Sequence, residues 1–247
     1  MKIYLAIISF LLESFLLYGQ ISDSVSAMNH LDSLDALQQK YINQGELDKF
    51  FGATMEAVNF ASTVFGESSA QYAGELFTLG AYYQIIGQID SAQQVYERLV
   101  PIVNQLSSLR GLYSSVLMNL GEVYISKYSF EAAEQMRLEA LSVREQLYGT
   151  KHRYYAESAM ALGAVYVSMR KFKKAEEYYL KSIQSLNQSK KKDDNLLASV
   201  LFRYGELKYF AGDFIKAEDY YLQSFNLFQI LDNPNINEYV QLVHEMG

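Results

Sequence analysis

Apolar residues recur at helical spacing along the chain, and the stretch over 154–183 shows the pattern clearly. Its apolar positions fall three or four residues apart in two runs, which are separated by a polar turn at Arg170 and Lys171. The first run consists of Tyr155, Ala159, Leu162, Gly163 and Tyr166, and the second of Phe172, Ala175, Tyr179 and Ile183. Such spacing places each run on one face of a helix. The pattern therefore predicts two antiparallel helices that pack against each other.

The same two-helix unit recurs along the chain. A Leu-Gly pair or its equivalent marks the first helix of each unit, and successive marker glycines are 41, 42, 42 and 42 positions apart. The marker glycines are Gly80, Gly121, Gly163, Gly205 and Gly247. A fixed period of this length predicts an array of stacked helix pairs, in which each unit covers the apolar face of its neighbour.

Other positions repeat in register with the marker glycines. Three residues after the marker stand Tyr83, Tyr124 and Tyr166, and seven after it the turn position holds Gly45, Gly87, Tyr128, Arg170 and Gly212. Twelve residues after it stand Ala92, Ala133, Ala175 and Ala217, and sixteen after it Tyr96, Arg137, Tyr179 and Tyr221. A glycine inside a helix costs about 1 kcal/mol relative to alanine, so its repetition indicates that the paired helices approach each other closely there.

At these residues the chain resembles the tetratricopeptide repeat family, in its 42-residue kinesin-light-chain-like variety. The resemblance implies an all-α fold, an α-solenoid in which antiparallel helix pairs stack into a right-handed superhelix over residues 28–247. The repeats are expected at about 28–66, 69–108, 111–150, 153–192 and 195–233, followed by a half repeat or capping helix over 235–247. The resemblance also implies a non-catalytic module or scaffold that binds a peptide or protein segment in the concave groove of the superhelix.

Groove positions follow from the same resemblance. The candidates are Phe77, Gln84, Met118, Asn119, Glu122, Ile125, Glu157, Met160, Val167, Phe202, Glu206, Tyr209 and Phe210. This predicted surface mixes apolar residues with glutamates and contains no Lys or Arg, which favours a neutral-to-basic or apolar segment as the ligand. Met118 and Met160 equally fit plain core packing. The patch of Phe202, Tyr209 and Phe210 equally fits packing against the terminal helix.

The first twenty residues have a different character. Lys2 is followed by an apolar run that ends at Gly19, as in a bacterial secretory signal peptide. Glu13 lies inside this run, and a buried first helix is the alternative interpretation. We expect a signal peptide over 1–20 with cleavage near Gly19 or Gln20, a polar lead-in over 21–27, and export to the periplasm or the extracellular space. No stable membrane span is expected after cleavage, because the run is shorter than the ~20 apolar residues that a bilayer requires.

Composition restricts the chemistry. The formal net charge of −7 argues against a nucleic-acid partner, because no basic stripe is present to neutralise phosphates. The sequence has no cysteine, three scattered histidines and no motif of a nucleotide-binding loop or a nucleophilic enzyme. We therefore expect no enzyme activity, no cofactor and no metal site. Pro101 falls late in a predicted second helix, where we expect a kink or an early end.

Two alternatives to a monomeric binding module stay open. The chain could form the N-terminal sensing or scaffolding region of a larger bacterial protein, such as a CHAT-type protease, a histidine kinase or a transcription regulator. It could also be a structural protein that self-associates end to end through uncapped helices. The partner is expected to be a protein or peptide of unknown identity.

Overall fold

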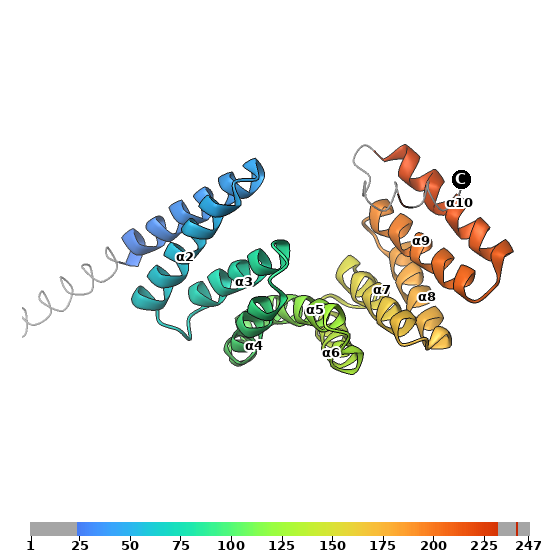
Figure 1. Cartoon of the computed structure of the whole chain (residues 1–247), viewed down its shortest axis with the longest axis horizontal. Helices are drawn as coiled ribbons and strands as arrows, with labels where there is room; N and C mark the ends of the chain where they lie inside the picture. The colour runs from blue at the N-terminus through green and yellow to red at the C-terminus, as the bar shows by residue number, and fades with distance from the viewer. Residues whose placement is uncertain (1–23, 232–240, 242–247) are drawn as a thin grey trace, which may run out of the picture. The chain divides into compact units, whose positions relative to one another are not determined.

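The fold is described from a computed structural model, which describes residues 24–231 and 241 of the chain. Residues 24–44 are helical, and the helices that follow are α2 (Leu47–Val64), α3 (Ala70–Ile85), α4 (Ile89–Gln105), the short 3-10 helix η1 (Ser107–Leu109), α5 (Arg110–Ser126), α6 (Phe130–Tyr148), α7 (Arg153–Ser168), α8 (Phe172–Gln188), α9 (Asp194–Phe210) and α10 (Phe214–Ile230) (Figure 1). No strand occurs among the described residues, and the helices follow one another in packed pairs. The predicted all-α class is confirmed.

Three local expectations have different outcomes. The predicted signal peptide lies outside the described residues, and so does the terminal half repeat apart from Gln241. Residues 24–27, expected as part of a polar lead-in, already belong to the first described helix. Of the kink or early end expected at Pro101, the early end is wrong, because α4 continues beyond the proline to Gln105. A proline removes one backbone donor, and the four remaining residues complete the last turn of the helix.

The chain divides into two compact units, Met1–Val95 and Tyr96–Gly247, which we describe separately. In the first unit α2 packs against α3, and Leu31 and Leu34 of the preceding helix form a small core with Ala57. Glu75 of α3 is buried in this unit, where its carboxylate accepts a 2.8 Å hydrogen bond from the Gln38 side-chain amide. Burial raises the pKa of Glu75 to about 7, the Gln38 hydrogen bond opposes the shift, and the charge of Asp35 adds to it.

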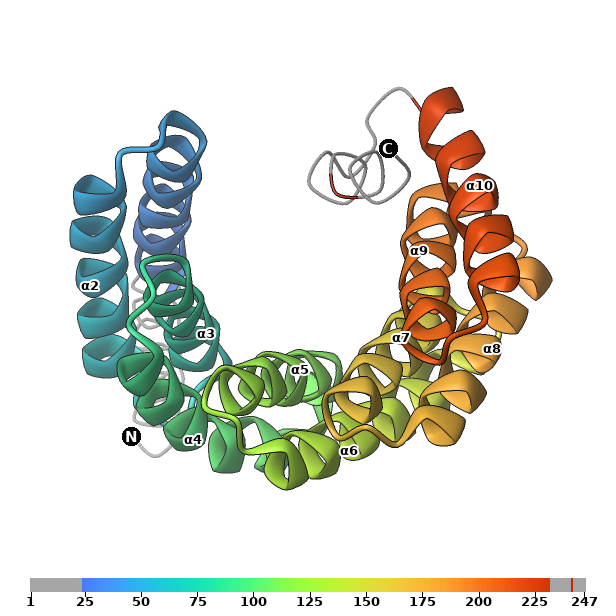
Figure 2. The same ribbon diagram turned by 45° about the vertical axis from the view of Figure 1, so that its right-hand side comes forward.

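The second unit contains three complete helix pairs. α5 packs against α6, α7 against α8 and α9 against α10, while α6 contacts α7 and α8 contacts α9. Within this unit α5, α7 and α9 lie along the inner side of the ribbon and α6 and α8 along its outer side (Figure 2). The first helix of each pair therefore lies beside the first helix of the next, as the contact between α7 and α9 also indicates.

Each helix pair turns at a residue in the left-handed conformation. The five residues with positive φ at these turns are Gly45, Gly87, Tyr128, Arg170 and Gly212, which are the predicted turn positions. The amide that follows each one donates back to the first helix; for example, Lys171 N lies 2.8 Å from Tyr166 O. This bond pattern satisfies carbonyls that the helix end would otherwise leave unpaired. Tyr128 and Arg170 adopt φ values of 57° and 54°, a conformation that favours glycine.

Three of the marker glycines, Gly121, Gly163 and Gly205, face large side chains of the second helix in their own pair. An ideal Cβ atom added to Gly163 would lie 2.5 Å from Cε1 of Tyr179, and one added to Gly205 would lie 2.6 Å from Cδ1 of Tyr221. At Gly121 the atom that such a Cβ would meet is Nε of Arg137, at 2.8 Å. The absence of a side chain at these glycines is what allows a buried ring, or in one pair a guanidinium, to lie flat against the first helix.

Side-chain bonds also join successive pairs in the second unit. The Tyr166 hydroxyl donates to Glu134 at 2.7 Å, and Lys208 donates to Glu176 at 2.6 Å. The Tyr166 hydrogen bond holds the pKa of Glu134 below its usual value, and the Lys208 hydrogen bond does the same for Glu176. Each of these bonds crosses from a second helix to the first helix of the following pair.

Candidate functional site

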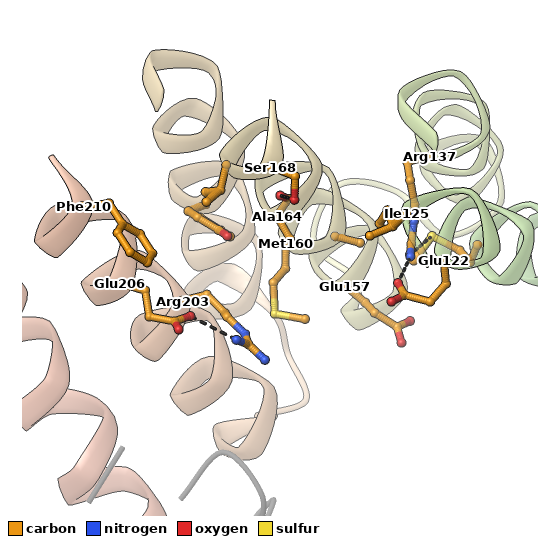
Figure 3. Close-up of a pocket in the computed structure, with 14 residues that line it drawn as sticks. Glu122, Ile125, Arg137, Glu157, Met160, Ala164, Ser168, Arg203, Glu206 and Phe210 are labelled. Carbon is orange, nitrogen blue, oxygen red and sulfur yellow. Dashed lines mark hydrogen bonds and ion pairs between the residues drawn. The ribbon is translucent and has the colours of Figure 1, made fainter. Parts of the chain in front are cut away.

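A cavity of about 480 Å³ opens on the inner side of the second unit. Its apolar lining comes mainly from three successive first helices: Met118 and Ile125 from α5, Met160, Ala161, Ala164 and Val167 from α7, and Phe210 from α9. Polar side chains of Glu122, Arg137, Glu157, Ser168, Arg203 and Glu206 surround this lining, together with Tyr179. Figure 3 shows these side chains along the cavity, with Met160 near its middle. We call it the Met160 cavity.

The structure brings many of the predicted groove residues together here. Eight of them line the cavity: Met118, Glu122, Ile125, Glu157, Met160, Val167, Glu206 and Phe210. Asn119 does not line it and donates a 3.0 Å hydrogen bond to the Tyr96 hydroxyl. Tyr209 is half exposed, with its ring edge-on to Phe210 and Phe214. Phe77 and Gln84 lie half-buried on α3, in the first unit.

Phe202 is a groove candidate that the structure places elsewhere. Its side chain is 0% exposed and belongs to the apolar core that α9 forms with α10, where its ring packs 5.7 Å from that of Tyr221. The prediction of Phe202 as a groove residue is therefore wrong. Tyr209 and Phe210 are 50% and 61% exposed, so these two neighbouring residues do face solvent.

The prediction that this surface contains no Lys or Arg is also wrong. Arg137 reaches the cavity from α6, and Arg203 lies on α9 one position after Phe202. The prediction considered only a few positions on the first helices, and Arg137 lies on a second helix. A signal for Arg137 was present in the sequence, because it stands where three other pairs have Tyr96, Tyr179 and Tyr221.

Arg137 lies almost completely buried behind the cavity wall. It is 6% exposed, and its Nη2 atom donates to Oε2 of Glu122 at 2.6 Å, while Nη1 lies 3.5 Å from the Met118 sulfur. Its Nε–H has no hydrogen-bond acceptor in the described part of the chain. Burial lowers the pKa of Arg137, and the Glu122 charge opposes that shift. An arginine in a protein keeps its charge nonetheless, so the bond to Glu122 joins two full charges.

Arg144 holds the next glutamate in a similar way. It is 5% exposed, and its Nη1 atom lies 2.8 Å from Oε2 of Glu157, 3.0 Å from the Ser158 hydroxyl and 3.1 Å from the Tyr154 carbonyl. Its Nε atom donates to the Ser114 hydroxyl at 3.3 Å. Arg137 and Arg144 stand seven residues apart on α6 and therefore on the same side of that helix, facing the first helices α5 and α7.

In each of these two ion pairs the arginine is buried and the glutamate is exposed to solvent. The side chains of Arg137 and Arg144 are each 7% exposed, whereas those of Glu122 and Glu157 are 57% and 39% exposed. A molecule that enters the cavity therefore meets the carboxylates first, with the guanidinium groups behind them. A third pair, Arg203 with Glu206 at 3.0 Å, lies on α9, where the two side chains are 36% and 20% exposed (Figure 3).

Comparison with known proteins agrees with this arrangement. A family model for the tetratricopeptide repeat matches residues 112–188, which carry α6, α7, α8 and most of α5. This part of the chain belongs to the tetratricopeptide repeat family. The Met160 cavity is lined largely by these repeats and otherwise by the pair that follows them.

Solved structures share this fold over most of the chain. BtubC (BKLC) from P. vanneervenii is 21% identical, with 83% of each chain covered and a TM-score of 0.72. A putative kinesin light chain with TPR-like repeats from Podosopora anserina is 14% identical, with 80% of this chain and 94% of that one covered and a TM-score of 0.68. The pilF protein of Pseudomonas aeruginosa is 18% identical, with 90% and 92% covered and a TM-score of 0.60. No curated protein matches the chain by sequence.

No helix in the part of the chain that the structure describes is both long enough and apolar enough to cross a membrane. No group of three or more His, Asp or Glu side chains in that part could hold a metal ion. Of the three histidines, His30 lies edge-on to Phe60, and His152 caps α7 by accepting from Tyr154 N; His244 is outside the described residues.

Proposed function

We propose that the protein is a non-catalytic interaction module that binds an extended segment of a partner protein in the Met160 cavity. The tetratricopeptide repeat fold suggests a scaffold for protein–protein interaction. The observation that carries the proposal is the cavity of about 480 Å³, in which partly exposed apolar side chains of three successive first helices lie beside glutamates. Concave surfaces with an apolar lining and a few fixed polar groups are where proteins usually bind ligands.

Selection from a random dodecapeptide library displayed on phage tests this proposal. We expect the wild-type protein to enrich a family of related peptides, whose synthetic versions bind with measurable affinity in fluorescence anisotropy. Phe210→Asp should weaken that binding by about tenfold, because Phe210 is 61% exposed at the cavity and its replacement removes apolar contact area.

Leu180→Asp is the matched control. Leu180 is a 46% exposed apolar residue on α8 and does not line the cavity, so the same substitution there should leave peptide binding unchanged. The proposal fails if no peptide is enriched above an unrelated helical control protein. It also fails if Phe210→Asp and Leu180→Asp weaken binding equally.

Self-association is a second candidate, favoured by the exposed apolar side chains of α10. Ile215 and Ile230 are 84% and 74% exposed on the last described helix of the array. If this face joins copies of the chain, light scattering should show a mass that rises with concentration, and Ile215→Ser should abolish the rise. A constant monomer mass over the concentration range would exclude this candidate.

We also propose that the protein is exported. The support is the apolar run that follows Lys2 and ends at Gly19, as in a signal peptide. Expression of the full chain in a bacterium, followed by fractionation and N-terminal sequencing, should recover a periplasmic or secreted form that begins near Ile21. Recovery of the intact chain in the cytoplasm would contradict export.

A further inference from the structure

The buried arginines Arg137 and Arg144 each bind one carboxylate oxygen of a glutamate and leave the other oxygen available to a ligand. Oε2 of Glu122 accepts from Arg137, and Oε2 of Glu157 accepts from Arg144. In the described part of the chain, Oε1 of either glutamate has no hydrogen-bond partner. Since each carboxylate is anchored by one oxygen and is 57% or 39% exposed, its other oxygen is a fixed, accessible hydrogen-bond acceptor.

The two anchored carboxylates form one polar group within the cavity. Both line it, and the charge of Glu157 acts on Arg137 as well as on its own partner. The Met118 sulfur lies 3.5 Å from Arg137 Nη1 and 3.5 Å from the Ser158 hydroxyl, and Ser158 in turn accepts from Arg144. This chain of contacts fixes the positions of the two arginines, and through them those of Glu122 and Glu157.

Folding alone does not explain the choice of Arg137. At the same repeat position Tyr179 and Tyr221 pack their rings on Gly163 and Gly205. Arg137 occupies the equivalent place on Gly121 with an Nε–H that finds no acceptor among the described residues. A buried donor left unpaired is unfavourable, and a buried ion pair adds little stability compared with a well-packed apolar group. What Arg137 supplies, and a tyrosine there could not, is a cation that pairs with Glu122.

The neighbouring surface is apolar. Met160, Val167 and Phe210 line the same cavity, and Met160 is a flexible side chain that adapts its shape to the group it contacts. The whole chain carries a formal net charge of −7, which attracts a cationic partner at long range. The accessible groups of the cavity are therefore two carboxylate acceptors from α5 and α7 beside apolar side chains, with the Arg203–Glu206 ion pair on α9.

We propose that the Met160 cavity binds a partner segment in which a lysine or arginine side chain is flanked by apolar residues. The cationic group donates to the free oxygens of Glu122 and Glu157, and the apolar flanks contact Met160, Val167 and Phe210. Arg137 and Arg144 are positioning residues that orient the two carboxylates. This inference rests on the proposed function, and it names the chemistry of the partner.

The charge of the peptides enriched from the dodecapeptide library tests the inference. We expect a lysine or arginine at one fixed position, with apolar residues on both sides of it. In the best peptide, replacement of that residue by glutamine should weaken binding by about tenfold, and replacement by glutamate by more, since hydrogen bonds between charged groups are the stronger ones. Enrichment of acidic peptides, or of peptides without a fixed charge, overturns the inference but leaves the proposed function standing. If no peptide is enriched, both fail.

Substitutions in the protein test whether Glu122 and Glu157 are the residues that bind the cationic group of the peptide. Glu122→Gln and Glu157→Gln should each weaken binding of the cationic peptide by about tenfold and leave binding of the glutamine-substituted peptide unchanged. Glu177→Gln is the matched control, because Glu177 is an exposed glutamate on α8 that pairs with Lys181 and does not line the cavity. Equal binding by Glu122→Gln, Glu157→Gln and the wild type overturns the assignment of these residues.

Arg137→Tyr tests the positioning role separately. It places in the third pair the residue that the fourth and fifth pairs have, so we expect the protein to fold with an unchanged or higher melting temperature. The cationic peptide should nevertheless bind several-fold more weakly, while the glutamine peptide binds as before. Arg137→Lys, which keeps a charge near Glu122, should restore part of the preference. A purely structural role for Arg137 predicts instead a lower melting temperature and an equal change for both peptides.

Discussion

Replacement of Gly163 by alanine tests the close contact on which the packing of each helix pair depends. The added Cβ would lie 2.5, 2.6 and 2.9 Å from three ring atoms of Tyr179, whereas ordinary contacts begin at 3.4 Å. The ring would have to retreat by about 0.9 Å, the difference between 3.4 and 2.5 Å. Tyr179 is 2% exposed, and the centroid of its ring lies 6.2 Å from that of the Tyr204 ring on α9, so the ring is closely surrounded.

Two effects of opposite sign then determine the free energy of unfolding. Alanine in a helix interior is favoured over glycine by about 1 kcal/mol. Overpacking of a full core costs about 1–3 kcal/mol. We therefore expect Gly163→Ala to destabilise the protein by about 0–2 kcal/mol. Gly52→Ala isolates the first effect, because Gly52 lies exposed in α2 with no atom within 4 Å of an added Cβ, and it should stabilise its helix.

The measurement is the difference between these two alanine variants, which we expect to be about 1–3 kcal/mol. Urea unfolding followed by far-UV circular dichroism gives the overall change. Hydrogen exchange of peptides from α2 and α7 gives the local one, since a repeat array can open in parts. In a Tyr179→Leu background the extra cost of Gly163→Ala should disappear. Equal free energies for the two alanine variants, within about 0.5 kcal/mol, would refute the packing argument.

Three further predictions concern stability. Acidification through pH about 4.5 should destabilise the second unit, because the hydrogen bond from the Tyr166 hydroxyl depresses the pKa of Glu134 in the folded state. The stability that ionised Glu134 contributes is present above its unfolded pKa and is lost as the pH falls. Glu134→Gln should therefore flatten this part of the profile of urea stability against pH. Glu75 acts in the opposite direction, since its pKa is raised to about 7, so stability should rise as the pH falls from about 7 to 4.5. Glu75→Gln should raise the free energy of unfolding above pH 7 by about 1–3 kcal/mol, and no increase would show that the ionised carboxylate does not destabilise the fold. Tyr128→Gly should stabilise the protein by about 0.5–1 kcal/mol in thermal unfolding, because Tyr128 is 82% exposed at a φ of 57°. A loss of stability would show that the contacts of the tyrosine ring outweigh the backbone strain.

Much of the fold could be predicted because the same residue types recur at the same structural positions in successive repeats. The turn positions are a case in point: Gly45, Gly87 and Gly212 identify a left-handed turn in three units, and the period then assigns the same conformation to Tyr128 and Arg170, whose own propensities oppose it. The marker glycines were interpretable for a similar reason, because a residue that weakens a helix recurs only where something packs against it.

The candidate site was less predictable, and the two errors have different causes. Phe202 falls on a groove position of the repeat, but the direction of one side chain depends on what packs beside it, here the ring of Tyr221. Arg137 was missed because a groove position was sought on first helices alone. A long side chain on a second helix can pass over a glycine and reach the inner surface, and Gly121 allows that passage.

The third helix pair shows how a repeat array can acquire a specific site without a new structural element. Two positions distinguish it from its neighbours in the second unit: Arg137 replaces a tyrosine, and Arg144 is buried seven residues further along α6. Glu122 lies one residue after the marker glycine, where the fifth pair has Glu206. The glycine that elsewhere accommodates a ring here accommodates the stem of an arginine, so the backbone needs no change. Because the following pair supplies Glu157 to Arg144, the polar group depends on the stacking of two pairs and is complete only in the assembled array. Chemistry of this kind is a property of the contact between repeats, which is why a repeat sequence that predicts the fold of each pair does not by itself predict what the array binds.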